Sequence, residues 1–196
     1  MTYMNRGDRR ASIVEAAVEI ILRDGLGATT VRGVAKALGA SPGQIHHHFA
    51  SADELRAEAF RTLWARTAPG FVERVSGMPP RERLLAALLA DDSTLEALSA
   101  KLWNDSLVAS GAEPHVRAAV REIMEQWLGL LVAAIKAGVD TGEFRSELSP
   151  EEIARRLAAF CLGVDVLASL GLPAHSRDEI RVRITKYIDL ELGSPR

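Results

Sequence analysis

The sequence predicts an all-α protein of about nine helices. Alanine and leucine are abundant while aromatic residues make up only 5% of the 196 residues, a composition that favours helix over strand. Apolar residues recur mostly at spacings of three and four, and no alternation of period two lasts long enough for a strand. Helix-capping signals also recur along the chain, and they place most of the elements.

Serines with a glutamate or glutamine three positions later mark the helix starts. In such a capping box, each side chain satisfies one N–H group that the first turn leaves without a partner. Proline suits the first helical position for the same reason, and it stands there at Pro42, Pro114 and Pro150. The boxes are Ser41…Gln44, Ser51…Glu54, Ser93…Glu96, Ser149…Glu152 and Ser176…Glu179.

Glycines mark the helix ends, as at Gly25, Gly39 and Gly142. One domain boundary is expected, inside the helix that starts near Asp53, so residues 1–52 and 53–196 would be rigidly joined. The predicted helices span residues 8–24, 30–38, 42–48, 53–76, 80–90, 94–110, 114–141, 150–170 and 177–192.

Composition and charge exclude several classes of protein. Apolar residues make up 47% and charged residues 26%, as in globular domains. No apolar run approaches the roughly 20 residues that span a bilayer, and the single Cys161 excludes an internal disulfide, so a cytoplasmic address is expected. The net charge of -2 argues against a general polyanion binder, although the first 66 residues carry +2.

Residues 29–55 contain the spacing of a helix-turn-helix. Thr30 is placed to cap a short helix, and the small Ala35 allows a second helix to cross closely. Gly39, four residues later, suits a turn that requires positive φ, and Ile45 returns an apolar side chain to the same core.

The second helix of this motif has few core residues besides Ile45 and Phe49. Such a polar helix is expected to present its outer face to a ligand, and a DNA major groove admits it. Gln44 can pair bidentately with adenine, Gly43 allows close approach to the backbone, and imidazoles can donate to phosphates.

Residues 9–55 resemble the DNA-binding domain of the tetracycline-repressor (TetR) family. The resemblance implies an all-helical homodimer whose first three helices bind DNA and whose variable C-terminal domain binds a small molecule. It rests on Gly25, Thr29-Thr30-Val31, Val34-Ala35, Leu38-Gly39, Ser41, Gly43, Ile45, His48-Phe49, Ser51 and Glu54-Leu55. The residues expected to face DNA are Thr30, Arg32, Ser41, Pro42, Gly43, Gln44, His46, His47 and His48.

The sequence departs from the family pattern at four positions. His46 stands where tyrosine is usual, His47 where an aromatic residue is frequent, and Pro42 and Ala52 where lysine is frequent. Losing the lysines should weaken nonspecific affinity and its salt dependence. The residues expected to supply the missing charge are Arg9, Arg10, Arg32 and Lys36.

Other readings of these residues are weaker. Consecutive helical residues diverge by about 100°, so His46, His47 and His48 cannot converge on one metal ion. Cys161 lies on an apolar helix, which favours packing over redox sensing. The sequence contains no G-x-S-x-G or comparable nucleophile motif, so we expect neither an enzyme nor a cofactor.

The predicted helices 114–141 and 150–170 have apolar faces broader than one core contact requires. A second copy would cover them and form a two-fold four-helix bundle, the alternative being burial within one chain. The residues off the main stripes are Leu128, Leu131, Ile135, Cys161, Leu162, Ala168 and Leu170.

A small-molecule site is expected in the C-terminal domain, although tryptophan and methionine at helical spacing are also typical of a core. The stretch from Trp103 resembles the family branch of choline-responsive betaine regulators, and a tryptophan face can hold a quaternary ammonium. The candidate lining is Trp103, Asn104, Leu107, Met124, Trp127, Leu128, Phe160 and Asp165, the last of these as pocket lining or interface partner.

The sequence therefore predicts a one-component transcriptional repressor. It would bind a pseudopalindromic operator as a homodimer and leave it when an effector binds. The alternatives are an architectural or protein-partnered DNA-binding factor without an effector, and a helical enzyme or carrier that uses the C-terminal cavity.

Overall fold

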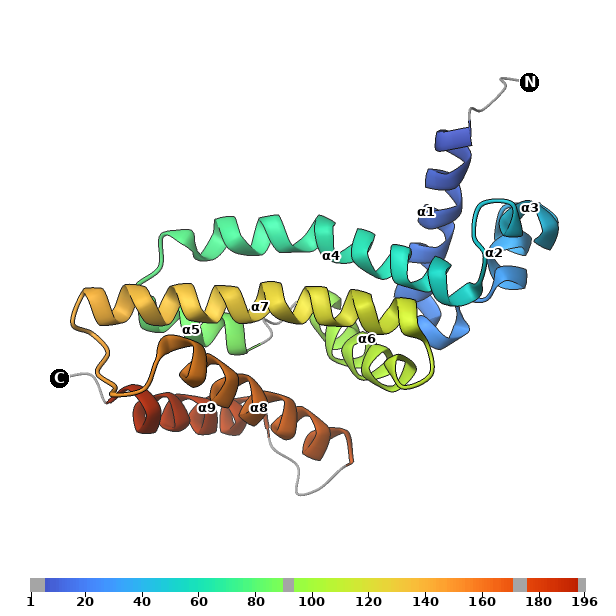
Figure 1. Cartoon of the computed structure of the whole chain (residues 1–196). Coiled ribbons are helices and arrows are strands. Elements are labelled where there is room, and N and C mark those ends of the chain that lie inside the picture. Colours follow the sequence, from blue (N-terminus) through green and yellow to red (C-terminus); the bar gives the residue numbers. More distant parts are fainter. Residues whose placement is uncertain (1–5, 90–93, 171–175, 194–196) are drawn as a thin grey trace. The chain divides into compact units, whose positions relative to one another are not determined.

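The computed structural model describes residues 6–89, 94–170 and 176–193. Over these ranges the chain forms nine α-helices and one short 3-10 helix, without a strand, which confirms the predicted all-α class (Figure 1). No described helix is long and apolar enough to cross a membrane. The elements are α1 (Arg6–Asp24), η1 (Leu26–Ala28), α2 (Val31–Ala37), α3 (Pro42–His46), α4 (Ala52–Ser76), α5 (Pro80–Leu88), α6 (Thr94–Ser110), α7 (Pro114–Asp140), α8 (Pro150–Ser169) and α9 (Arg177–Leu192).

The capping signals account for the helix starts. Complete capping boxes open α3 and α9, where the N–H groups of Gln44 and Glu179 donate to the hydroxyl oxygens of Ser41 and Ser176. The N–H group of Glu152 likewise donates to Ser149 at 3.2 Å. The box predicted at Ser93…Glu96 lies outside the described residues. Each predicted helix bound falls within about two residues of the observed one, because local hydrogen bonds set these starts.

Two compact units divide the chain, one made of residues 1–70 and 97–123 and the other of residues 71–96 and 124–196. In the first unit, α1, α2 and α3 share a buried core with α4, α6 and the first turns of α7. Its largest fully buried side chains include Ile13, Ile21, Leu26, Ile45, Phe49, Leu55 and Ile123. The first three helices therefore share their core with residues well beyond the predicted boundary at residue 52.

Long-range contacts within the first unit join the start of α7 to α4. Arg56 donates to the carbonyl oxygen of Thr29 at 3.0 Å, and it forms a 2.8 Å ion pair with Glu113. The carboxylate of Asp53 accepts hydrogen bonds from the N–H groups of His115 and Val116, which are free donors at the start of α7. The first turns of α4 thus hold both the residue before the α2 cap and the first turn of α7.

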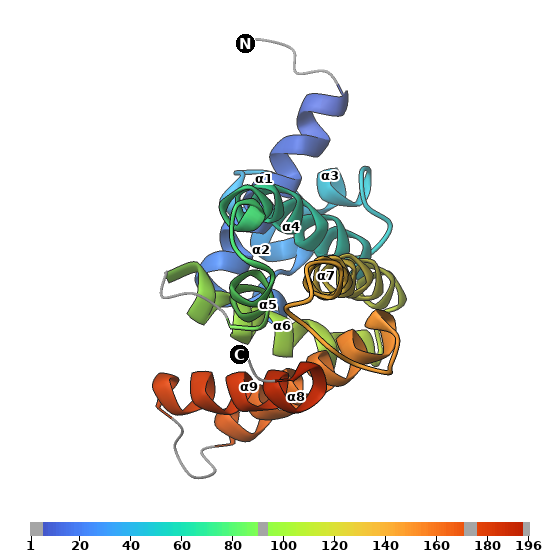
Figure 2. The ribbon, with the colours of Figure 1, turned by 90° about the vertical axis from the view of Figure 1, so that its left-hand side faces the viewer.

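The second unit is built mainly of α5, the rest of α7, α8 and α9, together with the last turns of α4 and the first residues of α6. Figure 2 shows α8 and α9 side by side, and the aromatic rings of Phe160 and Tyr187 stack between them with centroids 4.2 Å apart. The backbone of α7 approaches Phe144 so closely that a Cβ atom at Gly138 would lie 2.1 Å from its ring. The core of this unit includes Leu84, Leu131, Ile135, Phe144, Ile153, Leu157 and Ile188.

Part of the argument for a second copy on α7 is wrong. Leu131 and Ile135 are fully buried within their own chain, and Cys161 on α8 is only 5% exposed. Leu128 and Leu162 are half-buried, and the side chain of Ala168 lies outside the described residues. Leu131, Ile135 and Cys161 lie in a core shared by α5, α7, α8 and α9, so these three positions need no partner. Leu170, by contrast, is 67% exposed.

Candidate nucleic-acid interface

The turn between α2 and α3 is built as its spacing predicts. The hydroxyl oxygen of Thr30 caps α2 by accepting the N–H group of Gly33 at 3.0 Å. At the other end, Gly39 has φ of +59°, and the next N–H group, from Ala40, donates back to the carbonyl oxygen of Ala35 at 2.9 Å. This pairing is a Schellman motif, in which the residue with positive φ ends the helix.

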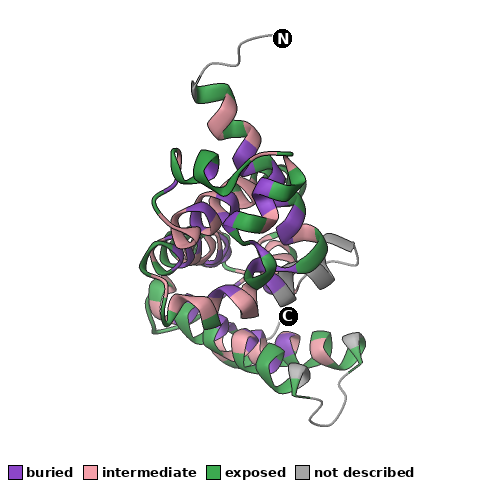
Figure 3. Ribbon diagram, turned by 90° about the vertical axis from the view of Figure 1, so that its right-hand side faces the viewer, coloured by how far each residue is buried: buried purple, intermediate pink, exposed green. Residues whose placement is uncertain are grey.

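Most of α3 and its flanking residues point away from the core (Figure 3). Within residues 41–49 only Ile45 and Phe49 are buried, both completely, and they anchor the segment. A helix of five residues has little stability by itself, so it persists here because of its cap and these two anchors. Of the predicted DNA-facing set, His48 is half-buried. The exposed members are Thr30, Arg32, Ser41, Pro42, Gly43, Gln44, His46 and His47.

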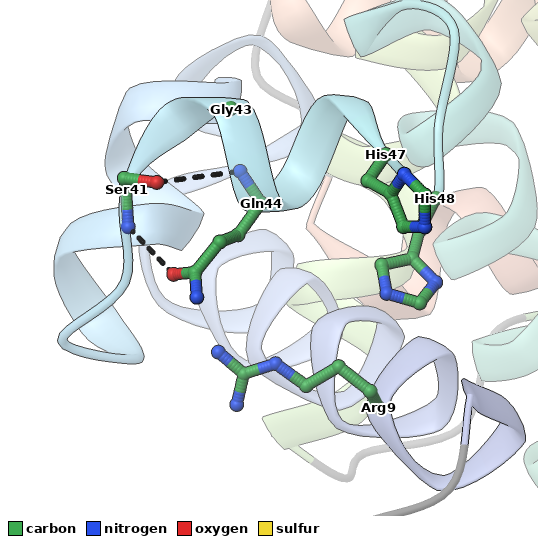
Figure 4. Close-up of a pocket in the computed structure, with 6 residues that line it drawn as sticks. All are labelled: Arg9, Ser41, Gly43, Gln44, His47 and His48. Atoms are coloured by element: carbon green, nitrogen blue, oxygen red, sulfur yellow. Dashed lines mark hydrogen bonds between the residues drawn. The ribbon is translucent and has the colours of Figure 1, made fainter.

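An open hollow of about 400 Å³ lies between α1 and α3. Figure 4 shows Arg9 reaching from α1 beneath Gln44, with the two histidines at the opposite end. Its lining is Arg9, Ser41, Gly43, Gln44, His47 and His48. The hollow thus brings together five of the predicted residues, whereas Thr30, Arg32, Pro42 and His46 do not line it.

The side chain of Gln44 caps the start of α3 and also lies on its exposed face. Its side-chain oxygen accepts the N–H group of Ser41 at 3.0 Å, which completes the capping box (Figure 4). The predicted bidentate pairing with adenine needs that same oxygen as an acceptor. In this conformation the amide NH₂ group is the part of Gln44 available to donate to a base.

The histidines and neighbouring cations have distinct surroundings. The rings of His47 and His48 meet edge to face with centroids 5.4 Å apart. Among the described residues no group of three metal-ligating side chains comes together, at this site or elsewhere. Arg32 and Lys36 are exposed on α2.

Arg10 does not supply free positive charge. Its guanidinium donates to both carboxylate oxygens of Glu58, one at 3.1 Å, and lies 3.3 Å from the carboxylate of Glu54. The hydrogen bond from Arg10 to Glu58 is the main reason that the pKa of the guanidinium is raised. The expectation that Arg10 replaces a missing lysine is therefore wrong, because two carboxylates already neutralise it.

Sequence reasoning left Arg9 out of the DNA-facing set. The only available signal was a basic residue on the first helix, and that signal did not distinguish it from Arg10. The structure separates them, since Arg9 lines the hollow and Arg10 faces α4.

The predicted effector residues are distributed over both compact units. In the first, Trp103 and Leu107 pack against the core, with the Trp103 ring 6.2 Å from that of Phe60, and Asn104 is half-buried. In the second, the Trp127 indole N–H donates to the carbonyl oxygen of Ala87 at 2.8 Å. Met124, Leu128 and Phe160 are half-buried there, and Asp165 is exposed.

Two family models match the chain. One, described as bacterial regulatory proteins of the tetR family, matches residues 13–59. The other, described as a BetI-type transcriptional repressor C-terminal domain, matches residues 80–193. Together they cover the helix-turn-helix and most of the remaining helices.

Individual relatives agree with these matches. The transcriptional regulator BetI of Burkholderia thailandensis is 30% identical over 195 residues, covering 94% of each chain. The transcriptional repressor KstR2 of Rhodococcus jostii is 30% identical over 152 residues, covering 74% of this chain and 72% of the relative. A regulator from Saccharomonospora viridis, solved in complex with choline, is 25% identical with a TM-score of 0.78 and covers 95% of this chain and 98% of its own. These relatives are transcriptional regulators and not enzymes, which agrees with the expectation from the sequence.

Proposed function

Since the chain belongs to the TetR family of transcriptional regulators, we propose that it is a homodimeric repressor that binds a pseudopalindromic DNA operator and releases it when a small molecule binds. The observation that carries the DNA-binding part is the outward-facing α3, because Ile45 and Phe49 are the buried residues of the segment 41–49. In this proposal residues 1–52 form the reading head, residues 53–196 form the effector and dimer domain, and the protein acts in the cytoplasm.

The proposed contacts divide into two kinds. Gln44, His47 and His48 meet base edges or nearby phosphates, because they line the hollow beside α3. His46 is exposed outside the hollow and meets the DNA from there. Thr30, Arg32 and Ser41 contact phosphates from the helix starts, where exposed N–H groups favour anions. Pro42 and Gly43 keep the start of α3 free of bulky side chains, which allows close approach to the DNA backbone.

The dimer interface of this proposal lies on α8 and α9. Along α8 and at the residue after it, the exposed positions Ala159, Gly163, Val166 and Leu170 form one stripe at spacings of four and three, with small residues where two helices can approach closely. Val182 and Leu190 are exposed apolar residues on α9, at 50% and 80%. A two-fold bundle would cover both faces.

Selection from a randomised DNA pool tests the regulator function. We expect the wild-type chain to enrich a pseudopalindromic sequence and to shift it in a gel at concentrations that leave a scrambled duplex free. If no sequence is enriched at low salt, the proposal fails.

Sedimentation of wild type and of Val166→Glu tests the dimer interface, since a carboxylate buried there should give monomers.

The effector that we propose is a choline-like quaternary ammonium. The BetI-type match and the choline complex of the Saccharomonospora viridis regulator support this class, and the half-buried Trp127 and Phe160 are of the aromatic type that attracts such cations. Choline should raise the melting temperature and release the selected duplex, whereas its uncharged carbon isostere should do neither. Equal effects of the two compounds would exclude recognition of the cation. DNA binding that no metabolite reverses would favour an architectural factor.

A further inference from the structure

The end of α3 is held by a side chain from another helix. Arg10, on α1, donates to the carbonyl oxygen of His48, and its guanidinium carbon lies 4.0 Å from the ring centroid of Phe49. Carbonyl groups at the end of a helix lack partners within it, so this contact satisfies one that α3 cannot satisfy. Phe49 is one of the two side chains that anchor the segment.

Two glutamates of α4 fix Arg10 in this orientation. Glu58 receives two hydrogen bonds from it, and Glu54 lies 3.3 Å away. Glu54 also accepts the N–H group of Ala50 at 2.8 Å, in the connection between α3 and α4. One network therefore ties the segment after α3 to both α1 and α4.

A five-residue helix depends on such external restraints. Helix nucleation is unfavourable, and a segment this short gains few internal hydrogen bonds. At its start the capping box restrains α3, and after its end Arg10 donates to the backbone at His48.

We propose that Arg10 is a positioning residue for DNA recognition, which sets the orientation of α3 without itself contacting DNA. This inference rests on the proposed DNA-binding function. It predicts that Arg10 acts on sequence selectivity, because selectivity requires that α3 side chains meet base edges within hydrogen-bonding geometry. A direct phosphate contact would instead act on all sequences alike and on the salt dependence of binding.

Charge-conserving and charge-removing variants separate these roles. Arg10→Lys keeps the positive charge but loses the planar fork that donates to Glu58 and His48 together. Glu58→Gln removes a negative charge beside Arg10 and weakens its restraint. As a positioning residue, Arg10 requires both variants to lose selectivity, whereas a phosphate contact would survive in Arg10→Lys and strengthen in Glu58→Gln.

The experiment measures dissociation constants for a duplex selected by the wild-type chain and for its scrambled counterpart, at about 50 to 200 mM salt. Selectivity is the dissociation constant for the scrambled duplex divided by that for the selected duplex. We expect this ratio to fall about tenfold in both variants, with the salt slope of binding unchanged. Amide exchange of residues 45–49 should accelerate in both. Arg9→Gln is the matched comparison, since Arg9 is adjacent to Arg10 in the sequence and its own guanidinium lines the hollow.

The outcomes are distinct. Undiminished selectivity in Arg10→Lys, or a salt slope about one unit smaller in Arg10→Gln, would overturn the positioning role. Equal weakening on both duplexes together with a lower melting temperature would also overturn it, in favour of general stability. If the wild-type chain itself selects no sequence, the proposed function fails before the role of Arg10 is tested.

Discussion

Asp53, in the first turn of α4, caps the start of α7 by binding His115. The Asp53 carboxylate accepts the backbone N–H group of His115 at 3.0 Å and lies 2.8 Å from Nδ1 of its ring. Its other oxygen accepts the N–H group of Val116 at 2.9 Å. Burial disfavours the charge, but the hydrogen bonds from His115 and Val116 outweigh it and hold the pKa of Asp53 below its ordinary value.

Removing this cap should destabilise the protein in a pH-dependent way. We expect Asp53→Ala to cost about 1 kcal/mol at pH 7, which lowers the melting temperature by about 2 to 4 °C. Because the folded-state pKa is depressed, the charged carboxylate stabilises the fold fully above about pH 4, and this contribution is lost as the pH falls through the folded-state pKa. The melting temperatures of wild type and Asp53→Ala should therefore converge at acidic pH. Asp53→Asn, which keeps an acceptor oxygen, should lie between; identical melts of wild type and Asp53→Ala at pH 7 would disprove the cap.

Gln44 and Thr30 should affect DNA binding differently. Gln44→Ala is expected to relax the preference at one base position by about 1 to 3 kcal/mol, while Thr30→Ala should weaken binding to all sequences alike. Gln44→Glu is the matched variant, because glutamate at this position retains the capping box but loses the amide donor. It should keep the wild-type melting temperature and change base preference. Parallel losses on selected and scrambled duplexes in all three variants would contradict these roles.

Gly39 should tolerate substitution poorly for reasons of backbone alone. Its φ is +59°, and a Cβ atom there would meet nothing within 4 Å. The left-handed conformation costs an L residue about 1 to 2 kcal/mol, so the melting temperature should fall in the order Asn, Ala, Val, with valine lowest. Gly27→Ala is the control, since its Cβ also meets open space and its φ is not positive. A Gly39→Val melt at the wild-type temperature would be inconsistent with positive φ.

Cys161 should be inert in the folded protein. It is 5% exposed, and burial, reinforced by the charge of Asp165, raises the pKa of its thiol to about 12. At pH 8 only about one thiol in ten thousand is ionised, so reaction with an aromatic disulfide reagent should be much slower than in denaturant. Wild-type and Cys161→Ala chains should respond alike to peroxide in DNA-binding assays. Fast native labelling would restore redox sensing as a possibility.

Local patterns predicted much of this fold. The boxes at Ser41 and Ser176, the proline starts and the positive φ of Gly39 depend on neighbours within five residues, so the sequence displays them directly. The 3-10 turn at Leu26–Ala28 was missed because Gly25 and Gly27 indicate only that the preceding helix ends.

Contacts between distant residues could not be predicted. The separation of Arg9 from Arg10 depends on glutamates more than 40 positions away, and the cap on α7 comes from Asp53, 62 positions before His115. Apolar periodicity also cannot tell which neighbour covers a second face. For that reason Leu131 and Ile135 looked like interface residues although their own chain buries them.

Arg56 joins two segments that are remote in sequence through one guanidinium. It binds the carbonyl oxygen just before the α2 cap and the carboxylate just before α7. Any displacement of Glu113 must therefore either move Thr29 with it or break one of these bonds. Strain arising where α7 begins would consequently reach the start of α2, in the pair of helices that we propose to face the operator.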